Sequence, residues 1–235
     1  MYSVREAAPG VWQFTEEDKF CSYLVLGSER GLLIDTGIGS GRLWEEAEKH
    51  TDLPYDVVLT HSHFDHAGCA GHYDVVFCHV NELLETRAAI GKMPYAVAEG
   101  FRFDLGGRLL TVVELFGHTK GSIGLLDAGN RLLFTGDMLG DRPVHMTSPD
   151  ADLRAYVASM DRLLGMREQV DTCFGAHSVG PIPLETAGKL KKCAQTILNG
   201  EAHPQPCVLF NGRPGLLAQA DGAGMLLWPG RDYTK

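Results

Sequence analysis

The sequence lacks any long apolar run, and this absence limits where the protein can act. Its apolar stretches are only a few residues long, whereas a helix that crosses a bilayer needs about 20 consecutive apolar residues. Residues 1–6 also lack the basic and then apolar pattern of a secretory signal peptide. We therefore expect a cytoplasmic protein with no membrane partner.

Closely spaced cysteine pairs are absent as well. None of the cysteines forms a C-x-x-C motif, and most of them lie within apolar runs. This pattern favours buried thiols over disulfides or metal ligands. The six residues concerned are Cys21, Cys69, Cys78, Cys173, Cys193 and Cys207.

Grouped positive charge is scarce too. The net charge is -9, and the only local basic cluster is formed by Lys189, Lys191 and Lys192. Because proteins contact polyanions through clustered Lys and Arg side chains, this balance argues against nucleic acid as a partner. We expect a small-molecule substrate instead, while the sequence leaves the oligomeric state open.

The chain has enough apolar residues for one large core. With 235 residues, of which 44% are hydrophobic, we expect a single domain spanning residues 1–235. Short apolar segments bounded by turn residues predict strands, and longer segments with helical periodicity predict helices. Strands are expected at 11–14, 22–26, 32–34, 56–60, 75–78, 109–115, 122–127, 131–135, 172–174, 207–211, 216–220 and 225–228, and helices at 43–49, 81–90, 150–164 and 184–198.

A histidine-rich segment directly follows the apolar strand expected at 56–60. It places His61, His63, Asp65 and His66 within six residues. A strand end is rigid while the turn after it can curl, so His61 and His63 can face one metal ion and Asp65 and His66 another. Imidazole and carboxylate ligands together suit zinc, iron or manganese rather than calcium. The segment therefore predicts a metal site.

Three further candidate ligands lie just past other expected strands. His118, Asp137 and His177 each follow a strand and each have a glycine close by in the sequence. The alternation of strands and helices predicts an α/β sandwich with sheets inside and helices outside, and such a sandwich places its loops along one edge. We expect these three side chains to meet the histidine-rich segment there.

Taken in order, these motifs resemble those of the metallo-β-lactamase superfamily. The resemblance runs from Leu33-Ile34-Asp35-Thr36-Gly37 through the H-x-H-x-D-H segment at 61–66, the G-H-T-x-G-S segment at 117–122 and Gly136-Asp137 to His177. It is strongest to the dinuclear hydrolase branch, which includes glyoxalase II and the acyl-homoserine lactonases. It implies an α/β fold, a four-layer αβ/βα sandwich of two mixed β-sheets flanked by helices. It also implies two divalent metal ions as cofactors, zinc first, with iron or manganese as alternatives.

The resemblance assigns a role to each motif residue. One implied ligand, Asp137, bridges both ions, and Asp35 orients a ligand without binding metal itself. The remaining ligands divide into His61, His63 and His118 for the first ion and Asp65, His66 and His177 for the second.

The implied reaction is hydrolysis of a small ester, thioester or lactone by a metal-bridging hydroxide. Asp65 and Asp137 are the expected catalytic residues, with Asp65 steering or accepting the proton of the attacking water. Residues 175–181 do not resemble the corresponding stretch of glyoxalase II, and the chain ends in strands where that enzyme has a helical domain. We therefore expect no glutathione specificity.

Two other functions remain open. A related branch binds a single iron through two histidines and an aspartate and oxidises persulfides, and His61, His118 and Asp137 would satisfy that arrangement. A non-catalytic metal-binding module is the second alternative. The candidates for the substrate pocket are residues in loops near the motifs. They are His145, Lys120 and Tyr95, with Phe20, Met93 and Arg142 as further ones.

Overall fold

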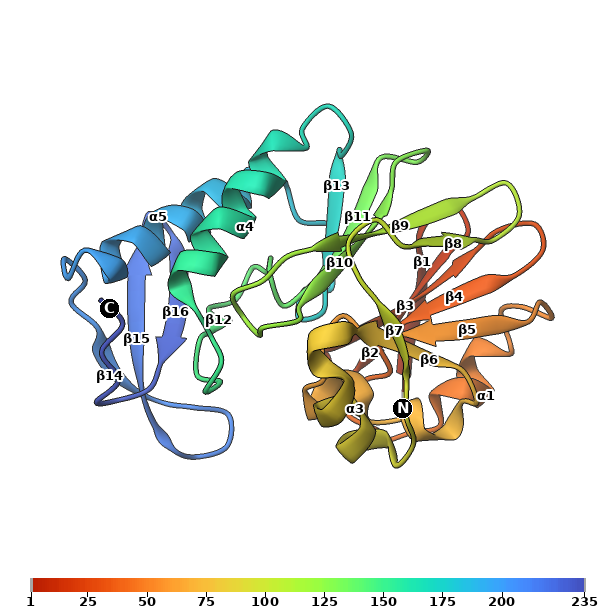
Figure 1. Ribbon diagram of the computed structural model, residues 1–235, viewed down its shortest axis with the longest axis horizontal. Coiled ribbons are helices and arrows are strands. Elements are labelled where there is room, and N and C mark those ends of the chain that lie inside the picture. Colours follow the sequence, from red (N-terminus) through yellow and green to blue (C-terminus); the bar gives the residue numbers. More distant parts are fainter. Residues whose placement is uncertain (1, 235) are drawn as a thin grey trace.

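The first of three β-sheets carries the N-terminal half of the chain (Figure 1). The computed structural model describes residues 2–234. This sheet has seven strands in sequence order. Strands β1 to β4 pair antiparallel, and β4 to β7 pair parallel, so the sheet is mixed. The strands are β1 (Tyr2–Ala8), β2 (Val11–Glu16), β3 (Phe20–Leu26), β4 (Gly31–Ile34), β5 (Tyr55–Val58), β6 (Val76–His79) and β7 (Tyr95–Val97).

The second sheet packs face to face with the first. Its order is β13-β11-β10-β9-β8, and only β11 and β13 run parallel. Between the two sheets lies a buried core that includes Tyr23, Ile34 and Val58 from the first and Leu125 and Phe134 from the second. The strands are β8 (Arg102–Asp104), β9 (Leu109–Glu114), β10 (Ile123–Asp127), β11 (Leu132–Gly136) and β13 (Thr172–Gly175).

Helices cover the outer faces of both sheets. Short helices α1 (Leu43–Ala47), α2 (Phe64–Ala67) and α3 (Leu83–Ile90), with the 3-10 turns η1 (Ala70–His72) and η2 (Val80–Glu82), lie against the first sheet. Helices α4 (Leu153–Gly165) and α5 (Thr186–Leu198) lie against the second. Asp152 caps α4 by accepting hydrogen bonds from the backbone N–H groups of Arg154 and Ala155. The α/β sandwich with two mixed sheets is thus confirmed.

A third sheet, which the sequence analysis did not predict, lies at the opposite end of the molecule from the first (Figure 1). Its order is β12-β16-β15-β14, and its residues Ala218, Met225 and Leu227 pack into the core of α4 and α5. The C-terminal strands were expected, but β12 is only two residues long and its parallel partner β16 is distant in sequence. The strands are β12 (Val144–His145), β14 (Gln205–Val208), β15 (Pro214–Ala220) and β16 (Ala223–Leu227).

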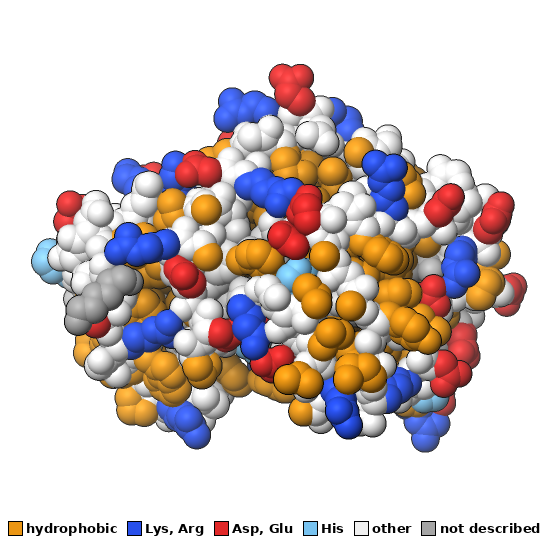
Figure 2. Space-filling view, viewed as in Figure 1, with side chains coloured by type: hydrophobic (Ala, Val, Ile, Leu, Met, Phe, Trp, Pro, Cys, Tyr) orange, Lys and Arg blue, Asp and Glu red, His pale blue; other side chains and the backbone are white. Residues whose placement is uncertain are grey.

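The surface carries charges of both signs, and the cysteines, all of which lie in the described part of the chain, form no disulfide. On the face shown in Figure 2, Lys and Arg side chains are interspersed with Asp and Glu, and hydrophobic side chains gather over the half that holds the first sheet. All six cysteines are free thiols, and all but Cys207 are buried. Within residues 2–234, no helix is long and apolar enough to cross a bilayer. That the chain forms one domain stays a prediction.

Candidate metal centre

Asp35 ties together the ends of two neighbouring strands at the edge where the candidate ligands lie. It follows β4 with a left-handed φ of 60°, a conformation that Asp and Asn tolerate better than most residues. Its Oδ1 accepts a hydrogen bond from the backbone N–H of Thr60 at 2.7 Å, and Oδ2 accepts one from the Thr60 hydroxyl at 2.8 Å. The turn that begins at His61 therefore leaves β5 in a fixed direction.

Three imidazoles converge on one point beside this turn. The Nε2 atom of His61 lies 2.9 Å from Nδ1 of His63, and Nε2 of His118 lies 3.2 Å from the former and 3.1 Å from the latter. A tetrahedral zinc ion about 2.0–2.1 Å from each nitrogen would hold such atoms roughly 3.3 Å apart. The spacing of the three nitrogens fits a metal ion between them.

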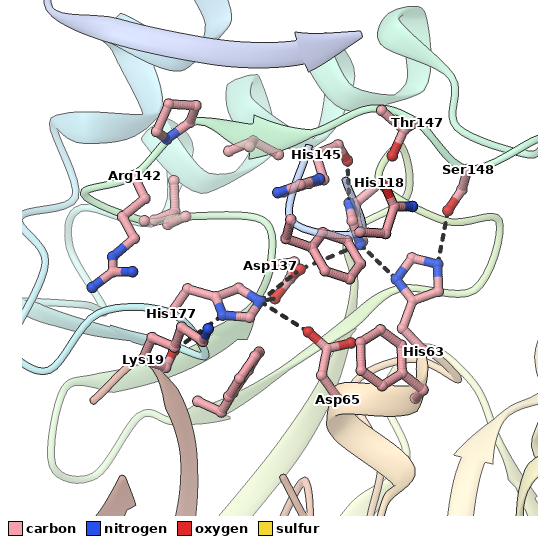
Figure 3. Close-up of a pocket in the computed structure, with 18 of the residues that line it drawn as sticks. Lys19, His63, Asp65, His118, Asp137, Arg142, His145, Thr147, Ser148 and His177 are labelled. Carbon is pink, nitrogen blue, oxygen red and sulfur yellow. Dashed lines mark hydrogen bonds and ion pairs between the residues drawn. The ribbon is translucent and has the colours of Figure 1, made fainter. Parts of the chain in front are cut away.

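A second group of side chains meets around Asp137. Its Oδ1 lies 3.2 Å from Nε2 of His66 and 3.1 Å from Nε2 of His177, and its Oδ2 lies 3.4 Å from Nε2 of His118. Asp65 Oδ2 lies 3.5 Å from Nε2 of His177 (Figure 3). Asp137 thus stands between the two groups, at distances from which one carboxylate can contact both.

Asp137 can reach this point because a glycine precedes it. Gly136 ends β11 with a φ of 53°, and a Cβ atom on it would lie 2.6 Å from Thr60 Oγ1. Any larger residue would therefore collide with the turn that carries His61. This explains why a glycine stands beside the carboxylate.

Each of the five histidines has its outer ring nitrogen occupied by a hydrogen bond. When the ring is neutral and this outer nitrogen carries the proton, the inner nitrogen, which faces the centre of the site, keeps a free lone pair, as in the ligand–partner pairs of known metal sites. The outer nitrogens pair with oxygen atoms: His61 with Thr60 Oγ1 (3.2 Å), His63 with Ser148 Oγ (2.7 Å), His66 with Asp35 Oδ2 (2.8 Å), His118 with the His145 carbonyl (2.6 Å) and His177 with the Lys19 carbonyl (3.1 Å). A carboxylate or carbonyl oxygen can only accept, so His66, His118 and His177 are the donors in their bonds.

Two buried atoms in the middle of the site have no hydrogen-bond partner. They are His66 Nε2 and Asp137 Oδ1, which belong to the few such side-chain atoms within residues 2–234. A buried polar atom without a partner is destabilising by about 1–3 kcal/mol. Because a cation between the two atoms would satisfy both, the residues present fit a bound metal.

The electrostatics of the site also fit a cation. Burial, together with the neighbouring imidazoles, lowers the pKa of His61 well below its ordinary value, and burial lowers the pKa of His118 to about 3. Burial alone would lower the pKa of His66 as well, but Asp35 and Asp137 raise it. Asp137 likewise raises the pKa of His177 against the effect of burial.

Asp137 is ionised in this setting. Burial alone would raise the pKa of its carboxyl group, but His177 and His66 bring that pKa well below its ordinary value. Without metal, protonation of His66 and His177 and ionisation of Asp137 therefore favour one another. Metal binding has to displace these protons, because only a neutral imidazole binds a metal ion.

A cavity of about 400 Å³ opens over these side chains, and His63, Asp65, His118, Asp137 and His177 line it. Two cationic side chains, Lys19 and Arg142, lie on the His177 side, and Ser148 lies on the His63 side (Figure 3). Much of the remaining wall is aromatic or aliphatic. Its apolar members include Phe20, Phe64, Leu139, Val144, Phe210 and Trp228.

Two exposed aromatic rings meet at this cavity. Phe64 of α2 is 57% exposed, Phe210 is 67% exposed, and their ring centroids are 5.8 Å apart. Phe210 lies in the turn between β14 and β15, and its ring also contacts that of His145 at 5.5 Å. The third sheet thus contributes a wall of the cavity. In the sequence, the only sign that Phe210 has a role is its position directly before the Asn211-Gly212 turn. The sequence gives no such sign for Trp228 and Ser148.

The pocket candidates divide into two sets. His145, Phe20 and Arg142 line the cavity. Lys120, Tyr95 and Met93 are not among the lining residues, so the expectation for them needs correction. The Lys120 ammonium pairs with Glu85 at 2.6 Å on the surface, which holds it away from the site. Tyr95 lies on the edge strand β7 and packs against Phe77.

The family follows from a match that covers the strands and loops just described. The family model described as Metallo-beta-lactamase superfamily matches residues 21–177. The chain belongs to the metallo-β-lactamase superfamily. Phe210 and Trp228 of the cavity wall lie beyond the matched residues.

Relatives and solved structures agree with this membership. An acyl-coenzyme A thioesterase of Homo sapiens is 30% identical in a 184-residue alignment that covers 60% of this chain and 66% of that protein. The alignment therefore spans just under two thirds of that relative. A hydroxyacylglutathione hydrolase of Haemophilus influenzae is 28% identical in a 188-residue alignment that covers 70% of this chain and 88% of that protein. A metallo-beta-lactamase from Pontibacter korlensis has the same fold, with a TM-score of 0.70 and 21% identity over 83% of this chain and 99% of that one.

Proposed function

We propose that this chain hydrolyses small thioesters with the help of two divalent metal ions. One observation carries the proposal: six side chains able to bind metal, from three separate segments, converge around the carboxylate of Asp137 beside a substrate-sized cavity. The names of two similar proteins, a thioesterase and a hydroxyacylglutathione hydrolase, support thioesters as the substrate class. Esters and lactones share the same reacting carbonyl and are secondary candidates.

The proposed ligand sets follow the three groups of neighbouring atoms. One ion would be held by His61, His63 and His118, the other by Asp65, His66 and His177, and Asp137 would contact both. Such ions, zinc being one that this donor set suits, would polarise the substrate carbonyl and make hydroxide available at neutral pH.

The protein's own groups then position the proton and the substrate. Asp65 lines the cavity with Oδ2 3.5 Å from His177 Nε2, so an ion held by both side chains would fix that oxygen and leave the other to accept the proton of the attacking water. A thiol leaving group has a pKa of about 8.5, so it can depart as the thiolate without a strong acid beside it. The carboxylate of Asp65 is thus sufficient as the proton carrier for a thioester.

The cavity favours a substrate with an apolar acyl group. Phe64 and Phe210 expose ring faces that a hydrocarbon chain can cover, whereas Lys19 and Arg142 offer positive charge on the His177 side of the cavity. An acyl chain along the aromatic rings and an anionic leaving group toward the two cations would use both features. We do not assign glutathione as that leaving group, because residues 175–181 lack the corresponding motif.

The test combines metal analysis with turnover. Protein purified without chelators should contain about two ions per chain and should hydrolyse acyl-coenzyme A thioesters in a panel that also includes lactoylglutathione, a lactone and an aryl ester. The Asp137→Ala variant should lose metal and turnover together. Retention of both ions and of full activity in this variant would contradict the proposal, and oxygen uptake with a persulfide by the iron-loaded protein would favour the oxidoreductase alternative.

A further inference from the structure

Glu82 is a buried acidic residue that the proposed reaction does not use. It ends the 3-10 turn η2 just before α3, and it is 1% exposed. A buried carboxylate is strongly destabilising unless hydrogen bonds or a charge partner compensate for its lost hydration. Its contacts therefore show what the residue is for.

Three hydrogen-bond donors from two different loops meet the Glu82 carboxylate. Its Oε2 accepts the backbone N–H of Ser62 at 2.5 Å. Its Oε1 accepts the backbone N–H of Gly121 at 3.2 Å and the hydroxyl of Thr119. Ser62 stands between His61 and His63, and Thr119 directly follows His118. One side chain thus joins the two loops that carry the three converging imidazoles.

The loop at 117–122 is shaped around this side chain. A Cβ atom on Gly121 would lie 2.6 Å from Glu82 Cγ, so only glycine allows the carboxylate to approach the loop backbone. The Thr119 hydroxyl is also held by Ser122 Oγ at 2.8 Å. The glycine, the hydroxyl pair and the carboxylate form one connected contact.

We propose that Glu82 is a positioning residue for the metal site formed by His61, His63 and His118. It contacts neither metal nor substrate, and it acts by fixing the distance between the two loops. The inference rests on the proposed metal binding. Outer partners of this kind typically change metal affinity about 10- to 100-fold when they are replaced.

The Glu82→Gln variant isolates the effect because it keeps the size of the side chain. Each carboxylate oxygen faces a backbone N–H, that of Ser62 on one side and that of Gly121 on the other. Backbone N–H groups cannot reverse into acceptors, so either orientation of the amide places an NH₂ group against a donor. The loops must then separate or lose a hydrogen bond.

Glu85 provides a matched control. It lies one turn of helix further on and contacts the same loop through its ion pair with Lys120, but both partners are nearly half exposed. The Glu85→Gln variant removes a surface contact to this loop and leaves the buried one intact. A general effect of loosening the loop would appear in both variants, whereas the positioning effect appears only in Glu82→Gln.

The experiment measures metal binding directly. Cobalt(II) is titrated into metal-free wild type, Glu82→Gln and Glu85→Gln while the visible absorption spectrum is recorded, and zinc affinity is measured against a competing chelator. Glu82→Gln should bind one ion about 10- to 100-fold more weakly, with an altered cobalt spectrum, and should lose kcat more than it changes KM. Glu85→Gln should match the wild type in all three.

Several results would overturn the inference. A folded Glu82→Gln variant with the wild-type metal affinity and cobalt spectrum would do so. An equal loss of metal affinity in Glu82→Gln and Glu85→Gln would do so as well. If Glu82→Gln does not fold, Thr119→Val decides, because it removes only the hydroxyl donor: about a tenfold weaker site supports the inference, and an unchanged site contradicts it. Wild-type protein that binds metal but hydrolyses no thioester would refute the proposed function alone, because the affinity comparison still tests Glu82.

Discussion

Replacing Asp35 by Asn should weaken the binding of one metal ion while the fold is retained. Asn tolerates the left-handed φ of 60° at this position, so the backbone is not strained. The carboxylate accepts hydrogen bonds from the backbone N–H of Thr60 through Oδ1 and from His66 Nδ1 through Oδ2. An amide has only one oxygen and cannot serve both.

The consequence depends on which way the amide turns. If its NH₂ group faces His66, the ring must accept at Nδ1, and its proton moves to Nε2, the atom that faces Asp137 at 3.2 Å. A protonated Nε2 cannot bind metal. If the NH₂ group faces Thr60 instead, it opposes a backbone N–H, which destabilises the strand end that positions His61.

The magnitude follows from one lost hydrogen bond to a charged group. Such a bond contributes about 1.5–3 kcal/mol, which corresponds to a loss of roughly 10- to 100-fold in affinity for the ion that His66 would bind. Asp56→Asn is the control, because Asp56 lies near the start of β5, at the end of that strand away from the site, and pairs there with Arg30. Isothermal titration with zinc should show two sites in the wild type and two sites of the same affinities in the control. In Asp35→Asn, one site should keep its wild-type affinity and the other should be weakened by this factor. Two undiminished sites in Asp35→Asn would refute the reasoning.

Three further predictions concern other contacts of the site. Ser148→Ala removes the acceptor for His63 Nε2 at 2.7 Å and should lower kcat several-fold by freeing the ring; unchanged kinetics would count against an orienting role. Phe210→Ala should raise KM about tenfold for thioesters with long acyl chains and leave KM for acetyl thioesters unchanged. Val208 on β14 is 74% exposed, and Val208→Ala should leave KM unchanged for both kinds of substrate. Equal effects on all chain lengths would argue against an acyl-binding wall. Because His66 and His177 have raised pKa values, protons compete with metal there, and the affinity of one site should keep rising with pH above 6.5; an affinity that levels off at pH 6.5 would contradict this.

The parts of the fold that could be read from the sequence are those with local patterns. The strands β4, β5 and β11 each contain an apolar run and are followed within three residues by Asp35, His61 and Asp137, and short-range patterns of this kind are visible in the sequence. Strand β1 was missed because it is an edge strand without a buried residue and has no apolar run, and β7 and β8 because they have only three residues each. The third sheet depends on the pairing of Val144 with Met225, two residues that are distant in sequence.

The same distinction applies to the site. The structure brings together the seven ligand candidates named from the sequence, because each lies in a segment that follows a strand, and the ends of these strands lie at a common edge. The residues that surround them could not be read in this way. Ser148 and Phe210 reach the cavity only through tertiary packing of the loop after β12 and of the turn before β15, and Glu82 is recognisable only once its three donors are seen around it.

The most direct test of the metal centre is a crystal structure of zinc-loaded protein with anomalous scattering measured at the zinc edge. We expect two peaks, one within bonding distance of His61, His63 and His118 and one within bonding distance of His66 and His177. Asp137 should lie between the peaks and contact both. A single peak, or two peaks that Asp137 does not join, would contradict the proposed dinuclear site.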